Sequence, residues 1–337
     1  MLQRDIIAIG GSFGSTAVLK QLLGGLPTDL PAAVMITTHM PTTSIGYLSE
    51  VLGSCSALPV SQAVDGQPVR PGRVYVAPPD RHLMVIDGMV VLGTGPRENM
   101  ARPSIDPLFR SVAFSYGSRA IGVILTGLLN DGASGLHAIK RRGGLSVVQH
   151  PLDAEAPDMP RAALEAVEVD HVAAADRMAG LLASLAGTPA EAAPAPSVDL
   201  ELEVSIAAGR QAGSGLLRQI AKPSPLTCPH CQGVLSEMKE HGPLRYRCQI
   251  GHAFTAEAVI SAYEKSMTEA IRIAMRMMEE RTELVARMAR DAREQGRTAV
   301  AELYEARAAE YSGYAATLRR AATMELRTAH RAAPQEV

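Results

Sequence analysis

The chain has 337 residues, of which 47% are hydrophobic and 20% are charged, and its formal net charge at pH 7 is −2. This length is enough for two structural units, and the near-neutral charge excludes a general electrostatic attraction to nucleic acid or acidic membranes. No apolar stretch approaches the about 18–20 residues that cross a bilayer, so we expect no membrane insertion. The N-terminus lacks the apolar run of a signal peptide, and four cysteines are too few for a disulfide scaffold. We therefore expect a cytoplasmic protein.

Residues 1–187 contain short apolar runs separated by turn residues or by helical spacing. The runs lie at residues 6–9, 32–36, 74–76, 84–86, 121–125 and 145–148. Because the main runs are continuous rather than alternating, they predict strands buried on both faces, as in a parallel sheet. Between the first two runs, apolar residues recur at helical spacing and end at Gly24 and Gly25, which predicts a covering helix. The predicted fold class is α/β, with a doubly wound, mostly parallel sheet.

The composition after residue 187 indicates a different organisation. Ala, Pro and Thr dominate there first, which is typical of an extended linker. We predict a doubly wound domain over residues 1–187, a linker over 188–226 with one short helix, a Cys/His module over 227–255, and helices over 256–330.

The helical segment breaks at Gly296, and a small-residue seam follows it. The seam consists of Ala301, Ala308, Ala315 and Ala322, with Tyr304, Tyr311 and Leu318 three places after the first three. This seven-residue repeat permits close helix packing. It predicts an antiparallel helical hairpin, and the sequence leaves open a coiled coil that dimerises or binds a partner.

Three polar residues follow three of the apolar runs. Ser12 follows the first run, His39 follows the second, and Asp131 lies in the loop after the run at 121–125. Because the carboxyl ends of parallel strands share one edge of an open sheet, we expect these side chains to converge. Their types are those of a Ser-His-Asp triad, in which the imidazole takes the serine proton and the carboxylate orients it. Each residue alone is also typical of a turn or loop role, and the sequence leaves that interpretation open.

Residues 10–14 also fit two other motifs. They satisfy G-x-S-x-G, but the α/β-hydrolase order is Ser, acid, His, and no upstream loop is present to supply an oxyanion hole. The dinucleotide fingerprint is incomplete, and the second run leads to His39 where an acidic ribose partner would stand. Neither fold is therefore predicted.

Six collinear segments carry a family resemblance. They are Ala8-Ile9-Gly10-Gly11-Ser12, Thr38-His39-Met40-Pro41, Val76-Ala77-Pro78-Pro79-Asp80-Arg81-His82-Leu83, Arg102-Pro103-Ser104-Ile105-Asp106, Leu125-Thr126-Gly127-Leu128-Leu129-Asn130-Asp131-Gly132-Ala133 and Met159-Pro160-Arg161-Ala162-Ala163. Through nearly all of residues 4–185 the sequence resembles the bacterial chemotaxis protein-glutamate methylesterases, of the CheB type. The resemblance implies a methylesterase catalytic domain over residues 1–187, with the family's triad on Ser12, His39 and Asp131. It also brings His82, Asp106 and Asn130 near the site, and loop-fixing roles are the expectation for His82 and Asp106.

The implied chemistry is acyl transfer without a cofactor. Ser12 would attack a γ-methyl ester on a chemoreceptor glutamate and release methanol, and water activated by His39 would hydrolyse the acyl-enzyme. Deamidation of glutamine is a second implied activity.

Two departures and one missing part qualify the resemblance. Phe13 stands where the family commonly has Thr, and Leu129 where a glycine is usual. These departures leave open a catalytically weak signalling adaptor with the same fold. The best-known members carry a receiver domain ahead of the catalytic one, but here the first strand begins within ten residues. We therefore expect no N-terminal receiver domain and no control by phosphorylation within the chain.

A second site is predicted in the Cys/His module. Cys228 and Cys231 form a C-x-x-C pair, and Cys248 and His252 follow at the spacing of a zinc ribbon. Three thiolates and one imidazole would complete a tetrahedral shell, which predicts structural zinc. An unmetallated loop and redox use of the C-x-x-C pair stay open. The alternative ligands are His230 and His241.

A zinc ribbon followed by Arg-rich helices is also typical of some nucleic-acid-binding proteins. Here acidic residues interleave with the arginines of residues 256–330, so no basic stripe forms. We therefore expect no nucleic acid partner. The expected partners are a methylated chemoreceptor-type substrate and, at the C-terminal helices, a signalling protein or a second copy of the chain.

Overall fold

The computed structural model describes all residues except 1, 42, 44–45, 211–213, 240–241 and 330–337. The chain divides into two compact units, Met1–Val259 and Ile260–Val337.

The centre of the first unit is a seven-stranded sheet in which every neighbouring pair is parallel. Its strand order is β3-β4-β2-β1-β7-β8-β9. The bounds are β1 (Ile6–Gly11), β2 (Ala33–Thr38), β3 (Val60–Gln62), β4 (Val74–Val76), β7 (Ala120–Ile124), β8 (Leu145–Gln149) and β9 (His171–Ala173). The prediction of a mostly parallel sheet is therefore confirmed.

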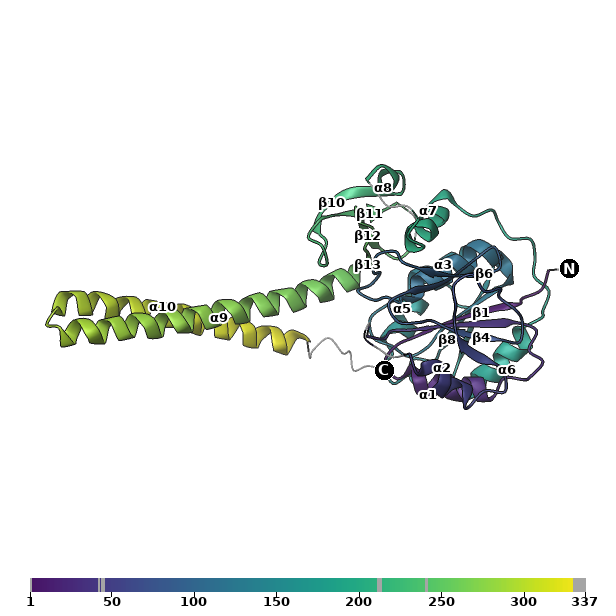
Figure 1. Cartoon of the computed structure of the whole chain (residues 1–337), viewed down its shortest axis with the longest axis horizontal. Helices are drawn as coiled ribbons and strands as arrows, with labels where there is room; N and C mark the ends of the chain where they lie inside the picture. The colour runs from purple at the N-terminus through teal and green to yellow at the C-terminus, as the bar shows by residue number, and fades with distance from the viewer. Residues whose placement is uncertain (1, 42, 44–45, 211–213, 240–241, 330–337) are drawn as a thin grey trace. The chain divides into compact units, whose positions relative to one another are not determined.

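Helices cover both faces of this sheet (Figure 1). One layer holds α1 (Ser15–Gly24), α2 (Leu48–Gly53) and α6 (Ala175–Leu185), and the other holds α3 (Ile105–Tyr116), α4 (Ala133–Arg141) and α5 (Asp158–Ala166). Successive residues of β1 alternate between the two cores: Ile7 and Ile9 pack with the first layer, and Ile6 and Ala8 pack with the second. This alternation is why the apolar runs are continuous in the sequence. The predicted doubly wound arrangement is confirmed.

Two further strands lie outside this sheet. β5 (His82–Ile86) and β6 (Met89–Gly93) form an antiparallel hairpin. The apolar run at 84–86 belongs to this hairpin, whose residues Leu83, Met84 and Val85 are buried in the core beside α3.

The segment that was expected as a linker, residues 188–226, contains regular structure. It holds α7 (Val198–Ala207), α8 (Ser214–Ile220) and most of β10 (Ala221–Thr227). Leu200 and Val204 of α7 are buried in the core that includes α3. The one short helix predicted in this segment corresponds to α7, whereas α8 and β10 were not predicted. The division into four domains stays a prediction.

A second, antiparallel sheet follows, with the strand order β10-β11-β12-β13. Its other members are β11 (Val234–Met238), β12 (Arg245–Cys248) and β13 (Ala253–Thr255). We call residues 221–255, which carry these four strands, the Cys3His module.

The second unit consists of α9 (Ala256–Glu294) from residue 260 onward and α10 (Thr298–Ala329). Gly296 lies between them with φ +74°, a conformation that glycine adopts without strain. Arg293 donates to Glu305 and the Arg281 guanidinium lies 4.2 Å from the Tyr311 ring centre, so the two helices run antiparallel as a hairpin. Ala301 and Ala315 of the predicted seam are buried. Among the described residues, no helix is both long and apolar enough to span a membrane.

Candidate active site and metal centre

Strand register places Ser12 and His39 side by side at the carboxyl edge of the main sheet. Gly11, the last residue of β1, pairs with Thr38, the last residue of β2, and the two candidate residues follow directly. On the other side of β1, the N–H of Ser12 donates to Thr126 O at 3.0 Å, just after β7. Ser12 therefore lies between the ends of the strands that lead to His39 and to Asp131.

The turn after Ser12 opens α1 at once. Gly14 adopts φ +78° at the N-cap, and the backbone N–H and hydroxyl of Ser15 both donate to the carbonyl of Ser12. Phe13, between them, is 56% exposed. The bulky departure beside Ser12 therefore faces solvent.

His39 and Asp131 are in direct contact. Nε2 of His39 lies 2.6 Å from Oδ2 of Asp131, and the Asp131 side chain is only 1% exposed. This contact joins the two residues that the sequence places 92 positions apart. In the described part of the chain the Ser12 hydroxyl forms no hydrogen bond with His39, and the triad roles stay a prediction.

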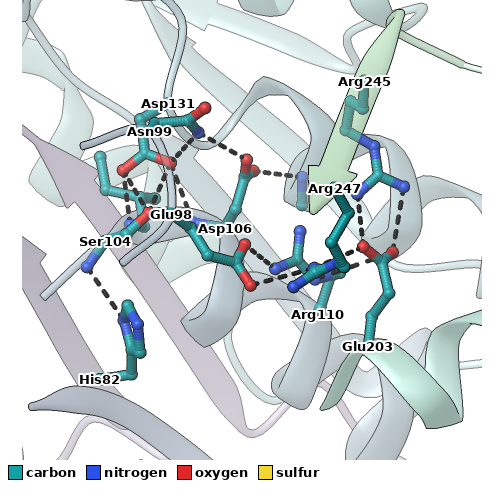
Figure 2. Close-up of polar contacts among 12 residues, drawn as sticks. His82, Glu98, Asn99, Ser104, Asp106, Arg110, Asp131, Glu203, Arg245 and Arg247 are labelled. Atoms are coloured by element: carbon teal, nitrogen blue, oxygen red, sulfur yellow. Dashed lines mark hydrogen bonds and ion pairs between the residues drawn. The ribbon is translucent and has the colours of Figure 1, made fainter. Parts of the chain in front are cut away.

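Asp131 is surrounded by donors. Ile105 N donates to its Oδ2, which His39 Nε2 also contacts. Asn99 Nδ2 donates to its Oδ1 at 2.9 Å, and Ser104 Oγ lies 2.9 Å from both oxygens (Figure 2). Burial alone would raise the pKa of Asp131, but the hydrogen bonds from His39, Ile105 and Asn99 and the charge of His39 hold it well below its ordinary value. Asp131 is therefore an ionised carboxylate at neutral pH, and it presents a negative charge to the imidazole of His39.

A second carboxyl group lies next to Asp131. Asp106 accepts hydrogen bonds from Gly135 N at 2.7 Å and from Asn99 Nδ2 at 3.1 Å. Burial, followed by the negative charge of Asp131, raises the pKa of Asp106 to about 7. The two carboxyl groups thus differ in the protonation that their surroundings favour.

One of the sequence departures, Leu129, lies in a strained backbone conformation. Leu129 adopts φ +61°, in the left-handed region that costs a leucine about 1–2 kcal/mol relative to glycine. Its side chain is 43% exposed, so little packing offsets this strain. The loop keeps the conformation that a glycine would adopt, although the residue is a leucine.

Sequence reasoning missed Asn99 and Ser104 as partners of Asp131. Ser104 lies in one of the matching segments, but Asn99 follows no strand and belongs to none of them. Of the expected loop residues, His82 contacts Pro96 O and Ser104 N rather than Asp131. Burial lowers the pKa of His82.

A buried ionic cluster lies beyond Asp106 (Figure 2). Its members are Glu98, Arg110, Glu203, Arg245 and Arg247, and all have side chains 8% exposed or less. Arg245 forms a two-pronged pair with Glu203 at 2.7 and 3.0 Å, and Arg247 donates to both glutamates, at 3.1 Å to Glu98 and 2.8 Å to Glu203. The cluster joins β12 of the Cys3His module to α3 and α7.

The four predicted metal ligands come together in the module. Their donor atoms (Sγ of Cys228, Cys231 and Cys248, and one ring nitrogen of His252) lie within 4.8 Å of one another. Sγ of Cys231 is 3.7 Å from Sγ of Cys248, and Nδ1 of His252 is 3.4 and 3.9 Å from Sγ of Cys248 and Cys228. A tetrahedral zinc ion with bonds of about 2.3 Å to sulfur and about 2.0 Å to nitrogen gives donor separations of roughly 3.8 and 3.6 Å. The donor set therefore fits such an ion.

The protonation of His252 is consistent with that fit, whereas a metal ion would have to displace the proton of Cys228. Burial, followed by the charges of His230 and Arg247, lowers the pKa of His252 to about 4, so its imidazole is neutral at pH 7. Burial raises the pKa of Cys228 to about 12, which a bound cation would reverse. Of the alternative ligands, His230 stacks near His252 with ring centres 4.2 Å apart, and His241 lies outside the described residues.

Comparisons with known proteins agree with this fold. A family model described as CheB methylesterase matches residues 7–182, about half of the chain. A relative from Leptospira interrogans is 40% identical over 182 residues, which are 54% of this chain and 94% of the relative. The crystal structure of the CheB methylesterase catalytic domain from Thermotoga maritima matches with a TM-score of 0.52 and 34% identity, over 54% of this chain and 98% of that one.

A longer relative shows the limits of the match. The Nitratidesulfovibrio vulgaris protein named "Protein-glutamate methylesterase/protein-glutamine glutaminase 2" is 36% identical over 183 residues, which are 53% of this chain and 50% of that protein. The chain thus spans about half the length of this relative. The family model ends before the Cys3His module and the hairpin, so neither part takes a role from it.

Proposed function

The chain belongs to the CheB methylesterase family, and on that premise we propose that it is a serine hydrolase that removes γ-methyl esters from glutamate side chains of a methylated chemoreceptor. Hydrolysis of glutamine side-chain amides is the second proposed reaction, because the Nitratidesulfovibrio relative is named for both activities. Both bonds are carboxyl derivatives that one nucleophile can cleave.

The contact between His39 and Asp131 is the observation that carries the proposal. Nε2 of His39 is engaged by the buried carboxylate at 2.6 Å, which leaves Nδ1 to take a proton. Ser12 follows the strand paired with the one that leads to His39, so its hydroxyl is the nucleophile that this nitrogen would serve. The arrangement supports the triad roles of Ser12, His39 and Asp131.

The proposed reaction has two halves. The Ser12 oxygen attacks the ester carbonyl carbon as Nδ1 of His39 takes the hydroxyl proton, and the tetrahedral intermediate then releases methanol, which carries that proton away. A water molecule next gives a proton to His39 and attacks the acyl-enzyme. The Ser12 oxygen leaves and regains its proton from His39, and the product is a free glutamate. Asp131 stabilises the imidazolium that forms in each half.

The tetrahedral intermediates need donors for their oxyanion. The N–H of Ser15 is engaged by Ser12 O, so backbone N–H groups around Leu128, in the loop that precedes Asp131, are the proposed donors. This loop begins beside Ser12, since Ser12 N binds Thr126 O.

We propose that the Cys3His module holds one structural zinc ion. Cys228, Cys231, Cys248 and His252 would supply four ligands and leave no position for water or substrate, so the ion would stabilise the module and take no part in ester hydrolysis. Thiolate ligands require reducing conditions, which supports a location in the cytoplasm.

Methanol release from a methylated receptor fragment tests the proposed function. We expect wild type to release methanol and Ser12→Ala to lower the rate by at least about a thousandfold. Ser184→Ala, which changes an exposed serine on α6, is the matched control and should keep the wild-type rate. Equal rates for Ser12→Ala and wild type would refute the serine mechanism. A wild type that binds the receptor without turnover would favour the signalling adaptor.

A further inference from the structure

We propose that Asn99 is a positioning residue for Asp131 and that Thr255 of the Cys3His module holds both Asn99 and Asn130, the residue before Asp131, in place, so that the module completes the esterase site. This inference rests on the proposed function, because it assigns roles around the same aspartate. It goes beyond the family comparison, since the family model ends at residue 182.

Asn99 lies between the aspartate and the module. Its Nδ2 group donates to Asp131 at 2.9 Å and to Asp106 at 3.1 Å, and its Oδ1 accepts the backbone N–H of Thr255 at 3.0 Å. The amide orientation follows from these partners, because two carboxylates face the NH2 group and an N–H faces the oxygen. The Asn99 side chain therefore links Asp131 to Thr255, the last residue of β13.

The backbone at Asn99 is held in an unusual conformation. Asn99 and Met100 have φ +48° and +64°, and consecutive left-handed residues other than glycine persist only where their surroundings hold them. The N–H of Asn99 donates to Ala253 O at 2.8 Å, and Ala253 N donates to Arg97 O at 3.4 Å. Residues on the module therefore fix the loop that carries Asn99.

A second connection reaches the other neighbour of Asp131. The hydroxyl of Thr255 donates to Oδ1 of Asn130 at 2.6 Å, and Nδ2 of Asn130 donates to Glu257. Asn130 precedes Asp131 in the chain and is buried. Thr255 thus contacts both Asn99 and Asn130, one through its backbone and one through its side chain.

The buried ionic cluster anchors these contacts. Arg247 of β12 donates to Glu98, the residue before Asn99, and to Gly251 O at 2.8 Å. Both side chains of the Arg247–Glu98 pair are 1% exposed. Since charges buried this deeply are costly to separate, the module cannot shift without disturbing the loop at Asn99.

The catalytic consequence concerns the orientation of His39. Asp131 orients the imidazole through one 2.6 Å contact, and small displacements of a catalytic group reduce turnover strongly. Without the Asn99 amide, Asp131 would keep Ile105 and Ser104 as donors but lose one of the hydrogen bonds that hold it. Without the Thr255 hydroxyl, Asn130, the residue before Asp131, would lose a hydrogen bond. We therefore expect lower kcat with little change in KM.

The test uses the full chain and p-nitrophenyl acetate, a small ester that needs no receptor docking. Asn99→Gly removes the side-chain amide, and glycine adopts the positive φ of this position without strain. Thr255→Val removes the side-chain hydroxyl. Thr255→Ser retains the hydroxyl and serves as the rescue variant. Thr255 also caps α9, because Ala258 N donates to its Oγ1. Ser197→Ala, which removes the side-chain cap of α7, therefore controls for the loss of a cap.

We expect Asn99→Gly to lower kcat about 10- to 100-fold and Thr255→Val about threefold or more, with KM within about twofold. Thr255→Ser and Ser197→Ala should stay within about twofold of wild type. The low-field proton NMR signal of the His39–Asp131 hydrogen bond should shift in Asn99→Gly and Thr255→Val only. Unchanged kcat and an unchanged signal in these two variants would overturn the proposal.

The two proposals fail in different ways. If wild type hydrolyses the ester no faster than Ser12→Ala, the serine hydrolase proposal fails, and the NMR signal alone decides whether Asn99 positions Asp131. If wild type is active and both module variants match Ser197→Ala in rate and signal, only the positioning role fails.

Discussion

Gly127 lies directly against Ser12. A Cβ atom placed on Gly127 would come within 2.9 Å of Cβ of Ser12, which is closer than real side chains approach. It would also overlap with the side chain of Met159, which is buried and packs against the main core. The loop after β7 therefore fits against the turn at Ser12 only because residue 127 lacks a side chain.

Gly127→Ala should reduce turnover, and its overlap with the buried Met159 should also reduce stability. The added methyl group would displace Ser12 by several tenths of an ångström, and we expect kcat for a small ester to fall about 10- to 100-fold. The control is Gly180→Ala, where a Cβ meets nothing within 4 Å and alanine favours the helix α6. Activity of Gly127→Ala equal to that of Gly180→Ala would contradict the close fit.

Glu203→Gln should destabilise the first unit strongly. Glu203 is fully buried and accepts hydrogen bonds from Arg245 and Arg247, so its loss leaves three buried guanidinium groups with Glu98 as the one remaining glutamate of the cluster. Removal of one partner from a buried pair costs about 3–5 kcal/mol in free energy of unfolding. Urea unfolding measures this cost, and Arg81→Gln, which breaks an exposed pair with Asp80, should change it by less than about 0.5 kcal/mol. A loss of similar size in both variants would show that the cluster does not stabilise the fold.

Asp106→Asn should flatten the pH dependence of stability. Because the pKa of Asp106 is raised to about 7, the folded chain keeps a proton there that the unfolded chain releases above about pH 4. The free energy of unfolding therefore falls as the pH rises from about 4 to about 7, by up to about 1.4 kcal/mol per pH unit. Asparagine cannot ionise, so the loss of stability between pH 5 and pH 8 should be roughly 2 kcal/mol smaller in the variant.

Thermal or urea unfolding at several pH values measures this difference. Asp29→Asn, which changes an exposed carboxylate, should follow the wild-type pH profile. If Asp106→Asn also follows that profile, Asp106 ionises normally in the folded protein.

Cys231→Ser should remove the zinc that we propose. We expect about one zinc ion per chain in wild type and a large fall in this variant, together with a lower thermal unfolding temperature, because a four-ligand shell holds structural zinc. Atomic emission measures the metal content. His230→Gln is the matched control, since His230 lies beside His252 but outside the four-residue cluster. Retention of zinc by Cys231→Ser and its loss from His230→Gln would reverse the ligand assignment.

The sequence predicted those features that follow from strand ends and from local spacing. Continuous apolar runs indicated the parallel sheet, and the shared carboxyl edge of that sheet predicted that His39 and Asp131 lie close together. The Cys3His cluster could be predicted because ligand spacing within a C-x-x-C pair is a local property.

The remaining partners depend on contacts between distant residues. Glu98 and Arg247 are 149 positions apart, and a charged side chain in a sequence indicates solvent exposure unless its buried partner is known. Acidic and apolar residues alternate along α7, so no sequence pattern indicated that Glu203 lies in the core, where Arg245 pairs with it. Asn99 lies in a loop without a strand or motif, so its contact with Asp131 had no sequence signal.

Register between strands also sets a condition on when this chain can act. Ser12, His39 and Asp131 follow β1, β2 and β7, and β1 pairs with both of its neighbours along its length. The pairing of β1 with β7 joins residues more than a hundred positions apart, a long-range step that folding completes slowly. A chain that has emerged only partly from the ribosome, or has opened at β7, holds the serine without its aspartate. With the proposed triad roles, esterase activity would therefore appear only once β1, β2 and β7 have paired.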